Sequence, residues 1–242
     1  MTITGEIPSR LADDNAGFSN IKKSIPCSFC NGFPGLEHLV GMPIDDITIL
    51  RTENFIVIPD IAPLLEGHIL IVTTKHYPCF GAMPPEHLSE SIAIKRQVKR
   101  MLTSAYCAPI FFEHGPATCD GLAGACVDHA HLHCLPVERE FFSLIAPGHN
   151  SEQISSIAQL AEYTKNGFSY LFYESLEESL RVYPLKAETD DIPSQHLRCA
   201  AARIFSISKW NWRDIIESPD YEKVMRPRIL KAVDLLRCTV TE

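Results

Sequence analysis

Short apolar runs separated by polar turns make the first half of the chain rich in predicted strands. Residues 46–50 and 55–58 form two runs around a Thr-Glu-Asn turn, and residues 67–73 form a third, more continuous run. Apolar runs of this length, bounded by turn residues, are typical of strands. Residues 109–113 and 126–135 extend the series, with a glycine-containing loop between them. A strand, a loop and a strand in this order favour an antiparallel sheet.

Helical periodicity appears between and after these strands. Residues 86–105 follow a Pro-Pro pair and carry apolar residues at helical spacing. Later segments alternate between the two patterns: a helix at 151–165 with Ser151 as N-cap, a hairpin of strands 169–174 and 180–183, a helix at about 193–205, and a last helical stretch broken or restarted at Pro227. We therefore expect an α+β protein, with an antiparallel sheet, helices packed on one side and a C-terminal α/β extension.

The most unusual stretch is Asp-His-Ala-His-Leu-His-Cys-Leu-Pro at residues 128–136. Side chains two apart in a strand share a face, so His129, His131 and His133 are predicted to project together. The intervening small and apolar side chains would face a core. Because imidazole can act as nucleophile, acid or metal ligand near neutral pH, this stretch is the candidate active site.

The composition is that of a globular protein and argues against two classes of partner. Of the 242 residues, 45% are hydrophobic and 21% are charged, with a net charge of -8 at pH 7 and a pI of about 5.7. An acidic chain disfavours binding to nucleic acid, which needs basic surface. No apolar run is long enough to span a bilayer. Neither nucleic acid nor a membrane is therefore an expected partner.

The cysteines indicate a reducing compartment. The chain has nine of them, and residues 1–10 lack the basic and apolar regions of a signal peptide. This combination predicts a cytoplasmic location, and the odd count excludes complete intramolecular pairing. Cys27 and Cys30, spaced by two residues before a turn, can chelate one zinc ion. Buried structural thiols and redox chemistry are the alternatives for this pair.

Several segments, in the same order, resemble the signature of the histidine triad (HIT) superfamily. They are Cys27-x-x-Cys30, the Pro-Asp-Ile-Ala-Pro segment at 59–63, the Gly-His-Ile-Leu-Ile-Val run from Gly67 followed by Lys75 and His76, and the three alternating histidines. His76 lies one position earlier than in the commonest form of this signature. The resemblance implies a HIT-like catalytic domain at residues 25–149. A flexible arm at 1–24 would precede it, and an extension at 150–242 would pack on it.

The resemblance also implies a structural zinc site. Cys27, Cys30, His76 and His129 would supply two thiolates and two imidazoles. Structural zinc prefers four ligands of these kinds in a closed tetrahedral site. Such a site would tie the N-terminal arm to the sheet, and zinc would not be the catalyst.

In the resemblance, the central histidine is the nucleophile. His131 would attack the α-phosphorus of a nucleotide and form a nucleotidyl-histidine intermediate, which water or another acceptor then resolves. His68 and His133 would contact the phosphate oxygens and stabilise developing charge. Asp60 would accept hydrogen bonds from the ribose hydroxyls.

Two segments near the leaving group depart from the family pattern. The sequence has Glu-His-Gly at 113–115 where an asparagine-containing segment is common, and Gly-Ala-Cys-Val at 124–127 where Gly-Gln-Ser-Val is common. Glu113 and Cys126 are accordingly predicted to contact the nucleotide. The third triad position is His133 and not the glutamine of hexose-1-phosphate uridylyltransferases, which favours hydrolase-type relatives.

The expected function is that of a nucleotide hydrolase or nucleotidyltransferase that cleaves at the α-phosphate of a nucleotide or nucleotide conjugate. One alternative, motivated by the altered segment at 124–127, is a non-catalytic nucleotide-binding module. Another is an open zinc hydrolase site in which Asp128, His129, His131 and His133 hold the metal with a water. A second copy of the chain is a further candidate partner, because family members often form dimers.

The role of several aromatic and basic residues in the extension has two possible interpretations. Five residues are candidates to line a pocket for a base or leaving group: Tyr170, Tyr173, Trp210, Trp212 and Arg198. The aromatic ones would equally fill a core between the helices and the hairpin.

Overall fold

A computed structural model describes residues 27–30, 33–118, 127, 129–140, 145, 149–186 and 192–240 of the chain. The predicted arm at residues 1–24 and the predicted site residue Cys126 lie outside the described residues. The boundaries expected at residues 25 and 150 stay predictions. Among the described residues, no helix combines the length and the apolar character needed to cross a membrane.

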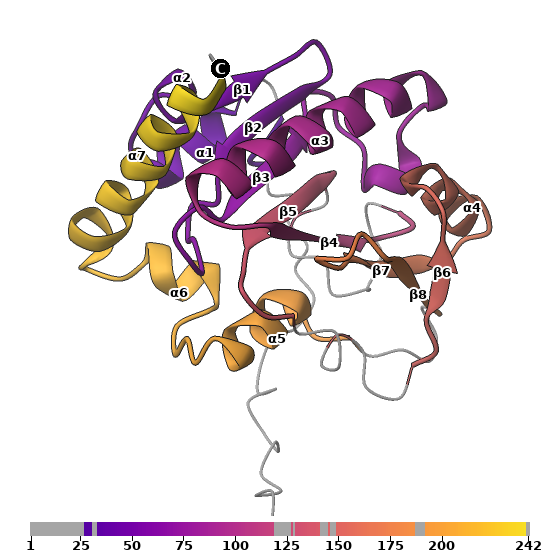
Figure 1. Ribbon diagram of the computed structural model, residues 1–242. Coiled ribbons are helices and arrows are strands. Elements are labelled where there is room, and N and C mark those ends of the chain that lie inside the picture. Colours follow the sequence, from indigo (N-terminus) through magenta and orange to yellow (C-terminus); the bar gives the residue numbers. More distant parts are fainter. Residues whose placement is uncertain are drawn as a thin grey trace, which may run out of the picture.

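The described strands form a single antiparallel sheet in the order β1-β2-β3-β5-β4-β7-β8-β6 (Figure 1). Their bounds are β1 Leu50–Arg51, β2 Phe55–Pro59, β3 Ile69–Thr73, β4 Pro109–Gly115, β5 His131–Pro136, β6 Glu152–Ile154, β7 Ser169–Glu174 and β8 Leu180–Leu185. The predicted α+β fold with an antiparallel sheet is confirmed. The predicted hairpin corresponds to β7 and β8, which pair along their whole length.

Helices cover the sheet and fill its connections. The α-helices are α1 Pro34–Val40, α2 Ile44–Ile47, α3 Leu88–Ala105, α4 Leu160–Lys165, α5 His196–Ile204, α6 Trp212–Ile216 and α7 Tyr221–Val240. Short 3-10 turns are η1 Phe80–Ala82, η2 Pro85–His87 and η4 Ile157–Gln159.

Helices lie on both faces of the sheet, so the expectation of one covered side is wrong. Phe111 of β4 belongs to the core cluster that contains Val98 and Leu102 of α3. The next residue, Phe112, belongs to a second cluster with Leu197 and Ala201 of α5. Because successive strand residues face opposite ways, α3 and α5 cover opposite faces of β4.

Two further local predictions are wrong because neighbouring structure overrides them. The strand expected at 46–50 is shortened to β1, since α2 begins after Pro43 and has Asp45 and Asp46 in its first turn, where acidic residues are favourable. The helix expected at 151–165 begins late, because β6 pairs with β8 at the sheet edge.

Pro227 lies inside α7 and does not break it. Proline removes one backbone hydrogen bond from a helix interior. Burial of Ile229, Val233 and Leu236 in the main core holds the helix against that cost.

Tyr170 fastens the extension to the rest of the molecule. Its hydroxyl donates to Glu113 Oε2 at 2.7 Å and accepts from the Gly81 amide at 3.0 Å. A Cβ atom at Gly115 would lie 2.1 Å from the Tyr170 ring, so only glycine fits beside it. The candidate pocket residue Tyr170 is therefore part of the core.

We expect Tyr170→Phe to lower the free energy of unfolding by about 1–3 kcal/mol, because it leaves a buried carboxyl oxygen and a buried amide without their partner. Tyr163→Phe is the matched control. Its hydroxyl bonds Glu152 at an exposed position, so a change within about 0.5 kcal/mol is expected. Urea unfolding of both variants measures the difference, and equal effects would contradict the anchoring role of Tyr170.

Candidate functional site

Strand pairing brings His131 and His133 together on the face that α5 covers, whereas His129 lies before β5 and is directed at the cysteines. His131 pairs with Val72 and His133 pairs with Leu70 of β3, and His133 also pairs with Phe112 of β4. The His133 and Phe112 rings stack with centroids 4.6 Å apart at 12°. Packing between two strands therefore sets the orientation of His133.

The backbone determines which nitrogen of His131 is available for chemistry. His131 Nδ1 lies 2.7 Å from the carbonyl oxygen of His129, so Nδ1–H must donate this bond. The Nε2 lone pair is then left for a substrate. Burial lowers the pKa of His131, which favours the neutral ring that a nucleophile requires.

A chain of hydrogen bonds orients the second histidine. The Leu64 amide donates to His68 Nδ1 at 3.2 Å, so the proton of neutral His68 is on Nε2. His68 Nε2 lies 3.0 Å from His133 Nδ1, and the bond therefore runs from His68 to His133. His133 then carries its own proton on Nε2. Burial brings the pKa of His68 to about 4 and that of His133 well below its ordinary value, so both rings are neutral.

Asp60 lies beneath this pair and is held by an arginine of the extension. Arg198 Nη1 donates to Asp60 Oδ2 at 2.5 Å, and the Ala62 amide donates to Oδ1 at 2.8 Å. Burial alone would raise the pKa of Asp60, but the charge of Arg198 and the hydrogen bond from the Ala62 amide hold it below the ordinary value. Asp60 is therefore a carboxylate in a buried ion pair.

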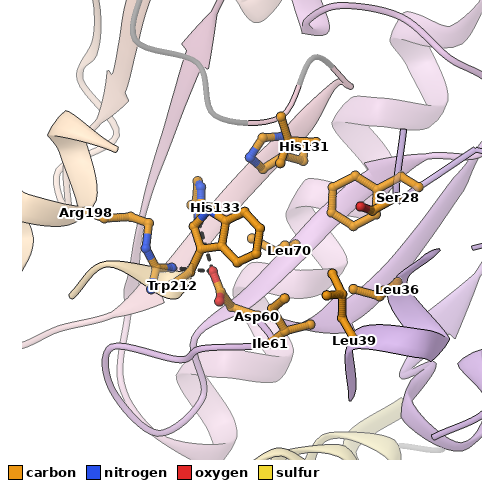
Figure 2. Close-up of a pocket in the computed structure, with 12 residues that line it drawn as sticks. Ser28, Leu36, Leu39, Asp60, Ile61, Leu70, His131, His133, Arg198 and Trp212 are labelled. Carbon is orange, nitrogen blue, oxygen red and sulfur yellow. Dashed lines mark hydrogen bonds and ion pairs between the residues drawn. The ribbon is translucent and has the colours of Figure 1, made fainter. Parts of the chain in front are cut away.

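A pocket opens beside His131 and His133 (Figure 2). Side chains from the N-terminal part of the described chain make one wall, and side chains of the extension close the other. The lining residues are Ser28, Phe29, Leu36, Leu39, Asp60, Ile61, Leu70, Val127, His131, His133, Arg198 and Trp212. An apolar cleft that ends at two imidazoles suits a ligand with a flat apolar part and a polar end.

A smaller cavity on the same side of the sheet shows residues that sequence reasoning missed. It is lined by His131, His133 and Arg198 together with Phe112, His114, Gln195 and Leu197. His114 Nε2 accepts the Leu197 amide at 3.2 Å. The signal in the sequence was the alternation of Phe112 and His114 in one strand, which places both on the histidine face.

The predicted metal ligands lie together. The ligand atoms of Cys27, Cys30, His76 and His129 are all within 4.8 Å of one another. Cys27 Sγ is 3.4 Å from His129 Nδ1, and Cys30 Sγ is 3.2 Å from His76 Nδ1. Ligands of a tetrahedral zinc ion with ordinary bond lengths lie about 3.5 Å apart. The donor set and its spacing fit zinc, despite the early position of His76 in the sequence.

A second contact fixes His129 for this role. His129 Nε2 lies 2.8 Å from the carbonyl oxygen of Thr73, so Nε2–H donates and Nδ1 is directed at the two sulfurs. A hydrogen bond of this kind on the outer nitrogen is common for histidines that bind metals. The geometry suggests zinc binding at this cluster.

Phe29 connects the cluster to the pocket. It lies between the two cysteines in sequence, and its ring is 5.5 Å from the His129 ring and 5.9 Å from the His131 ring. The same ring lines the pocket. The position of this wall therefore depends on the order of the Cys27–Cys30 segment.

Not all predicted site residues join the histidines. Glu113 alternates with Phe112 and points to the opposite face, where its carboxyl group bonds the Phe80 amide and Tyr170. Burial raises its pKa to about 8. The predicted contact between Glu113 and a nucleotide is wrong, because the sheet separates them. Tyr173 is buried in the core with α5, whereas Trp212 and Arg198 line the pocket.

The alternative of one metal held by three triad histidines is not supported by the described residues. His129 is directed at the cysteines, and His131 Nδ1 is engaged by a carbonyl oxygen. Asp128 lies outside the described residues. A second group, Asp60, His68 and His133, also has its ligand atoms within 4.8 Å. There the guanidinium of Arg198 places a positive charge where a metal ion would bind.

A comparison with protein families matches residues 19–148, more than half of the chain, to the family described as "protein similar to CwfJ C-terminal". An uncharacterized HIT-like protein of Mycobacterium tuberculosis is 29% identical over 113 residues, which are 46% of this chain and 72% of that protein. A solved structure of a zinc-bound histidine triad family protein from Mycobacterium smegmatis matches with 23% identity and a TM-score of 0.32, and covers 50% of this chain and 82% of that one.

Two curated relatives are named for reactions of nucleotides. The adenosine 5'-monophosphoramidase of Saccharomyces cerevisiae is 28% identical over 49% of this chain and 67% of its own length. The asymmetrical bis(5'-nucleosyl)-tetraphosphatase of Schizosaccharomyces pombe is 24% identical over 42% of this chain, which spans only 54% of that enzyme. These relatives support nucleotide hydrolysis in general.

We expect the neutral His68 to make stability depend on pH. A histidine in the unfolded chain has a pKa near 6.5, whereas the folded His68 has a pKa of about 4. Between these two values the unfolded state binds a proton that the folded state does not bind. The contribution of neutral His68 to the unfolding free energy is complete above pH 6.5 and is lost as the pH falls toward 4. The unfolding free energy of the wild type, minus that of His68→Gln, should fall by about 2 kcal/mol between pH 7 and pH 5. Urea unfolding at each pH measures it, and a constant difference would contradict the assignment.

Proposed function

We propose that this chain, which belongs to the family of proteins similar to the CwfJ C-terminal region within the histidine triad superfamily, is a nucleotide hydrolase or nucleotidyltransferase with His131 as its nucleophile. The observation that carries the proposal is the hydrogen bond from His131 Nδ1 to the His129 carbonyl oxygen. It leaves a neutral ring with its Nε2 lone pair beside a pocket for a nucleotide.

The proposed reaction has two displacements at the α-phosphorus. In the first, the Nε2 lone pair of His131 forms a bond to phosphorus, and the bond to the leaving group breaks with its electron pair on that group. In the second, a water oxygen forms a bond to phosphorus and releases one proton to solvent, the P–N bond breaks with its electron pair returning to Nε2, and a nucleoside monophosphate leaves. An alternative acceptor in place of water would make the protein a transferase. Two easier displacements replace one difficult one.

The surrounding groups suit the charges that develop. The His131 ring becomes positive when Nε2 binds phosphorus, and the carbonyl oxygen at Nδ1 stabilises that charge. His133 presents Nε2–H as a donor for a phosphoryl oxygen, because its Nδ1 accepts from His68. This donor is set before the substrate arrives, which is the condition for effective electrostatic stabilisation.

We expect brief incubation with nucleotide substrates to add the mass of a nucleoside monophosphate to the wild type. His131→Ala should form no adduct and lose turnover by at least about 10³-fold, the effect of removing a nucleophile. The panel contains dinucleoside polyphosphates, nucleoside phosphoramidates and nucleotide sugars, and the readout is intact-protein mass spectrometry without an acid quench.

His87→Ala is the matched control for this experiment. His87 lies in η2, where it contacts the Tyr77 hydroxyl, and it is not among the residues that line the pocket, so adduct and turnover should be unchanged. Normal turnover in His131→Ala would contradict the proposed mechanism. Nucleotide binding with no adduct and no product in the wild type would favour the binding-module alternative.

We further propose that Cys27, Cys30, His76 and His129 hold one zinc ion with a structural role. The fit of the donor set and its spacing supports this assignment. Zinc would order the Cys27–Cys30 segment and with it the Phe29 wall of the pocket. It would leave the chemistry at phosphorus to the histidines.

Cys30→Ser is expected to lose the zinc that native mass spectrometry finds in the wild type, with a thermal midpoint lower by at least about 5 °C and weaker AMP binding. Cys107→Ser, a change of the same kind at a partly exposed thiol outside the cluster, should keep zinc, midpoint and affinity. If a chelator abolished turnover at once while the fold persisted, zinc would be catalytic and this proposal would be wrong.

A further inference from the structure

Segment 60–63, whose residues Asp60 and Ile61 line the pocket, accepts hydrogen bonds from the extension. Asp60 Oδ2 accepts from Arg198 Nη1, and the Ala62 carbonyl accepts from Arg198 Nη2 at 2.6 Å. The Ile61 carbonyl accepts the Tyr221 hydroxyl at 2.9 Å, and the Pro63 carbonyl accepts from Arg228 at 3.4 Å. The remaining oxygen of Asp60 accepts the Ala62 amide.

The Asp60–Arg198 pair is too well sealed to open for a neutral ligand. Both residues are 4% exposed. Arg198 is held from a third direction as well, because its Nε donates to the Trp210 carbonyl oxygen at 3.2 Å. A sugar hydroxyl is a weaker partner for a carboxylate than a guanidinium. Drawing Asp60 away from Arg198 would leave a buried charge without its partner.

The other described lining residues offer little to a sugar. Asp60 is the sole carboxylate among them, Ser28 supplies one hydroxyl, and the two imidazoles face the phosphate position. The rest of the lining is apolar or aromatic apart from Arg198, and Trp212 of α6 forms part of the wall from the extension (Figure 2). Such a surface can hold a base by stacking and burial.

Trp212 is itself fixed in place. Its amide donates to Gln195 Oε1 at 3.0 Å, while Gln195 Nε2 donates to Asn211 Oδ1 at 2.8 Å. The Arg213 guanidinium lies over the indole, 4.6 Å from its centroid. The extension thus supplies an aromatic wall and, through Arg198, occupies the Oδ2 atom of Asp60 with a charged donor.

We infer that the described residues of the pocket bind a nucleotide by its phosphate and base, and that Asp60 does not read the 2'- and 3'-hydroxyls of the sugar. The ribose role that the family resemblance implies for Asp60 would then be replaced by the ion pair with Arg198. The three residues of the extension that donate to segment 60–63, namely Arg198, Tyr221 and Arg228, lie beyond residue 148, where the family match ends. The substrate class widens to deoxynucleotides and dideoxynucleotides. This inference rests on the proposed function, because it concerns the same pocket.

The test compares the affinities of AMP, 2'-deoxy-AMP and 2',3'-dideoxy-AMP for the full wild-type chain, measured by calorimetry. We expect the three dissociation constants to agree within about twofold. A carboxylate that bound both hydroxyls would make AMP more than about tenfold tighter than dideoxy-AMP, because hydrogen bonds to a charged group are strong. The wild-type ratio needs no variant to fold.

Arg198→Gln adds a second measurement. It keeps a donor for the Ala62 carbonyl but frees one oxygen of Asp60, so AMP should become about fivefold to tenfold tighter than dideoxy-AMP. Arg198→Lys, which keeps the positive charge, should show no such preference. Circular dichroism shows which variants remain folded.

The outcomes separate the two proposals. A strong preference of the wild type for AMP, together with a His131 adduct, would overturn the inference and leave the proposed function intact. Failure of all three nucleotides to bind would overturn both. Equal affinities without any adduct would support the inference and contradict only the catalytic mechanism.

Discussion

The buried ion pair between Asp60 and Arg198 is the constraint on which the site depends. A carboxylate that is almost completely removed from water needs a charged partner, and the two imidazoles beside it, those of His68 and His133, are neutral. The partner comes from α5, so this helix must lie on the histidine face in one position. That position also places Leu197 against His114 and Trp212 over the pocket. The geometry of the site therefore depends on how the extension packs against the sheet.

The same burial that makes the ion pair necessary keeps the histidines neutral. His68 and His133 share one hydrogen bond whose direction is set by the Leu64 amide, and His131 is oriented by a carbonyl oxygen. Neutral rings with assigned protons can attack or donate without first exchanging protons with solvent. Backbone groups determine the tautomers of His68 and His131, and the hydrogen bond from His68 then determines that of His133.

Local sequence patterns predicted what depends on local geometry. Alternation placed His131 and His133 on one face, and the family resemblance pointed to the four residues whose ligand atoms form the candidate metal cluster. Glu113 shows the limit, since a shift of one residue in a strand moves a side chain to the other face. Arg198 could be named as a candidate, but its bond to Asp60 spans 138 positions and depends on how α5 packs. The hydrophobic periodicity of the sequence does not show that Arg198 pairs with Asp60.

The proposed nucleophile, His131, is supported from two directions by parts far apart in sequence. On one side, His129 belongs to the candidate metal cluster while its carbonyl oxygen orients His131. On the other, Arg198 fixes Asp60 beneath His133. Because the cluster also positions Phe29, loss of a bound metal would disturb both the Phe29 wall of the pocket and the His129 carbonyl that orients His131. Loss of the ion pair would instead change the pocket by leaving the charge of Asp60 without its partner. The two disturbances should therefore differ in kind: the first would alter how tightly a base is held, and the second would alter which sugars are accepted.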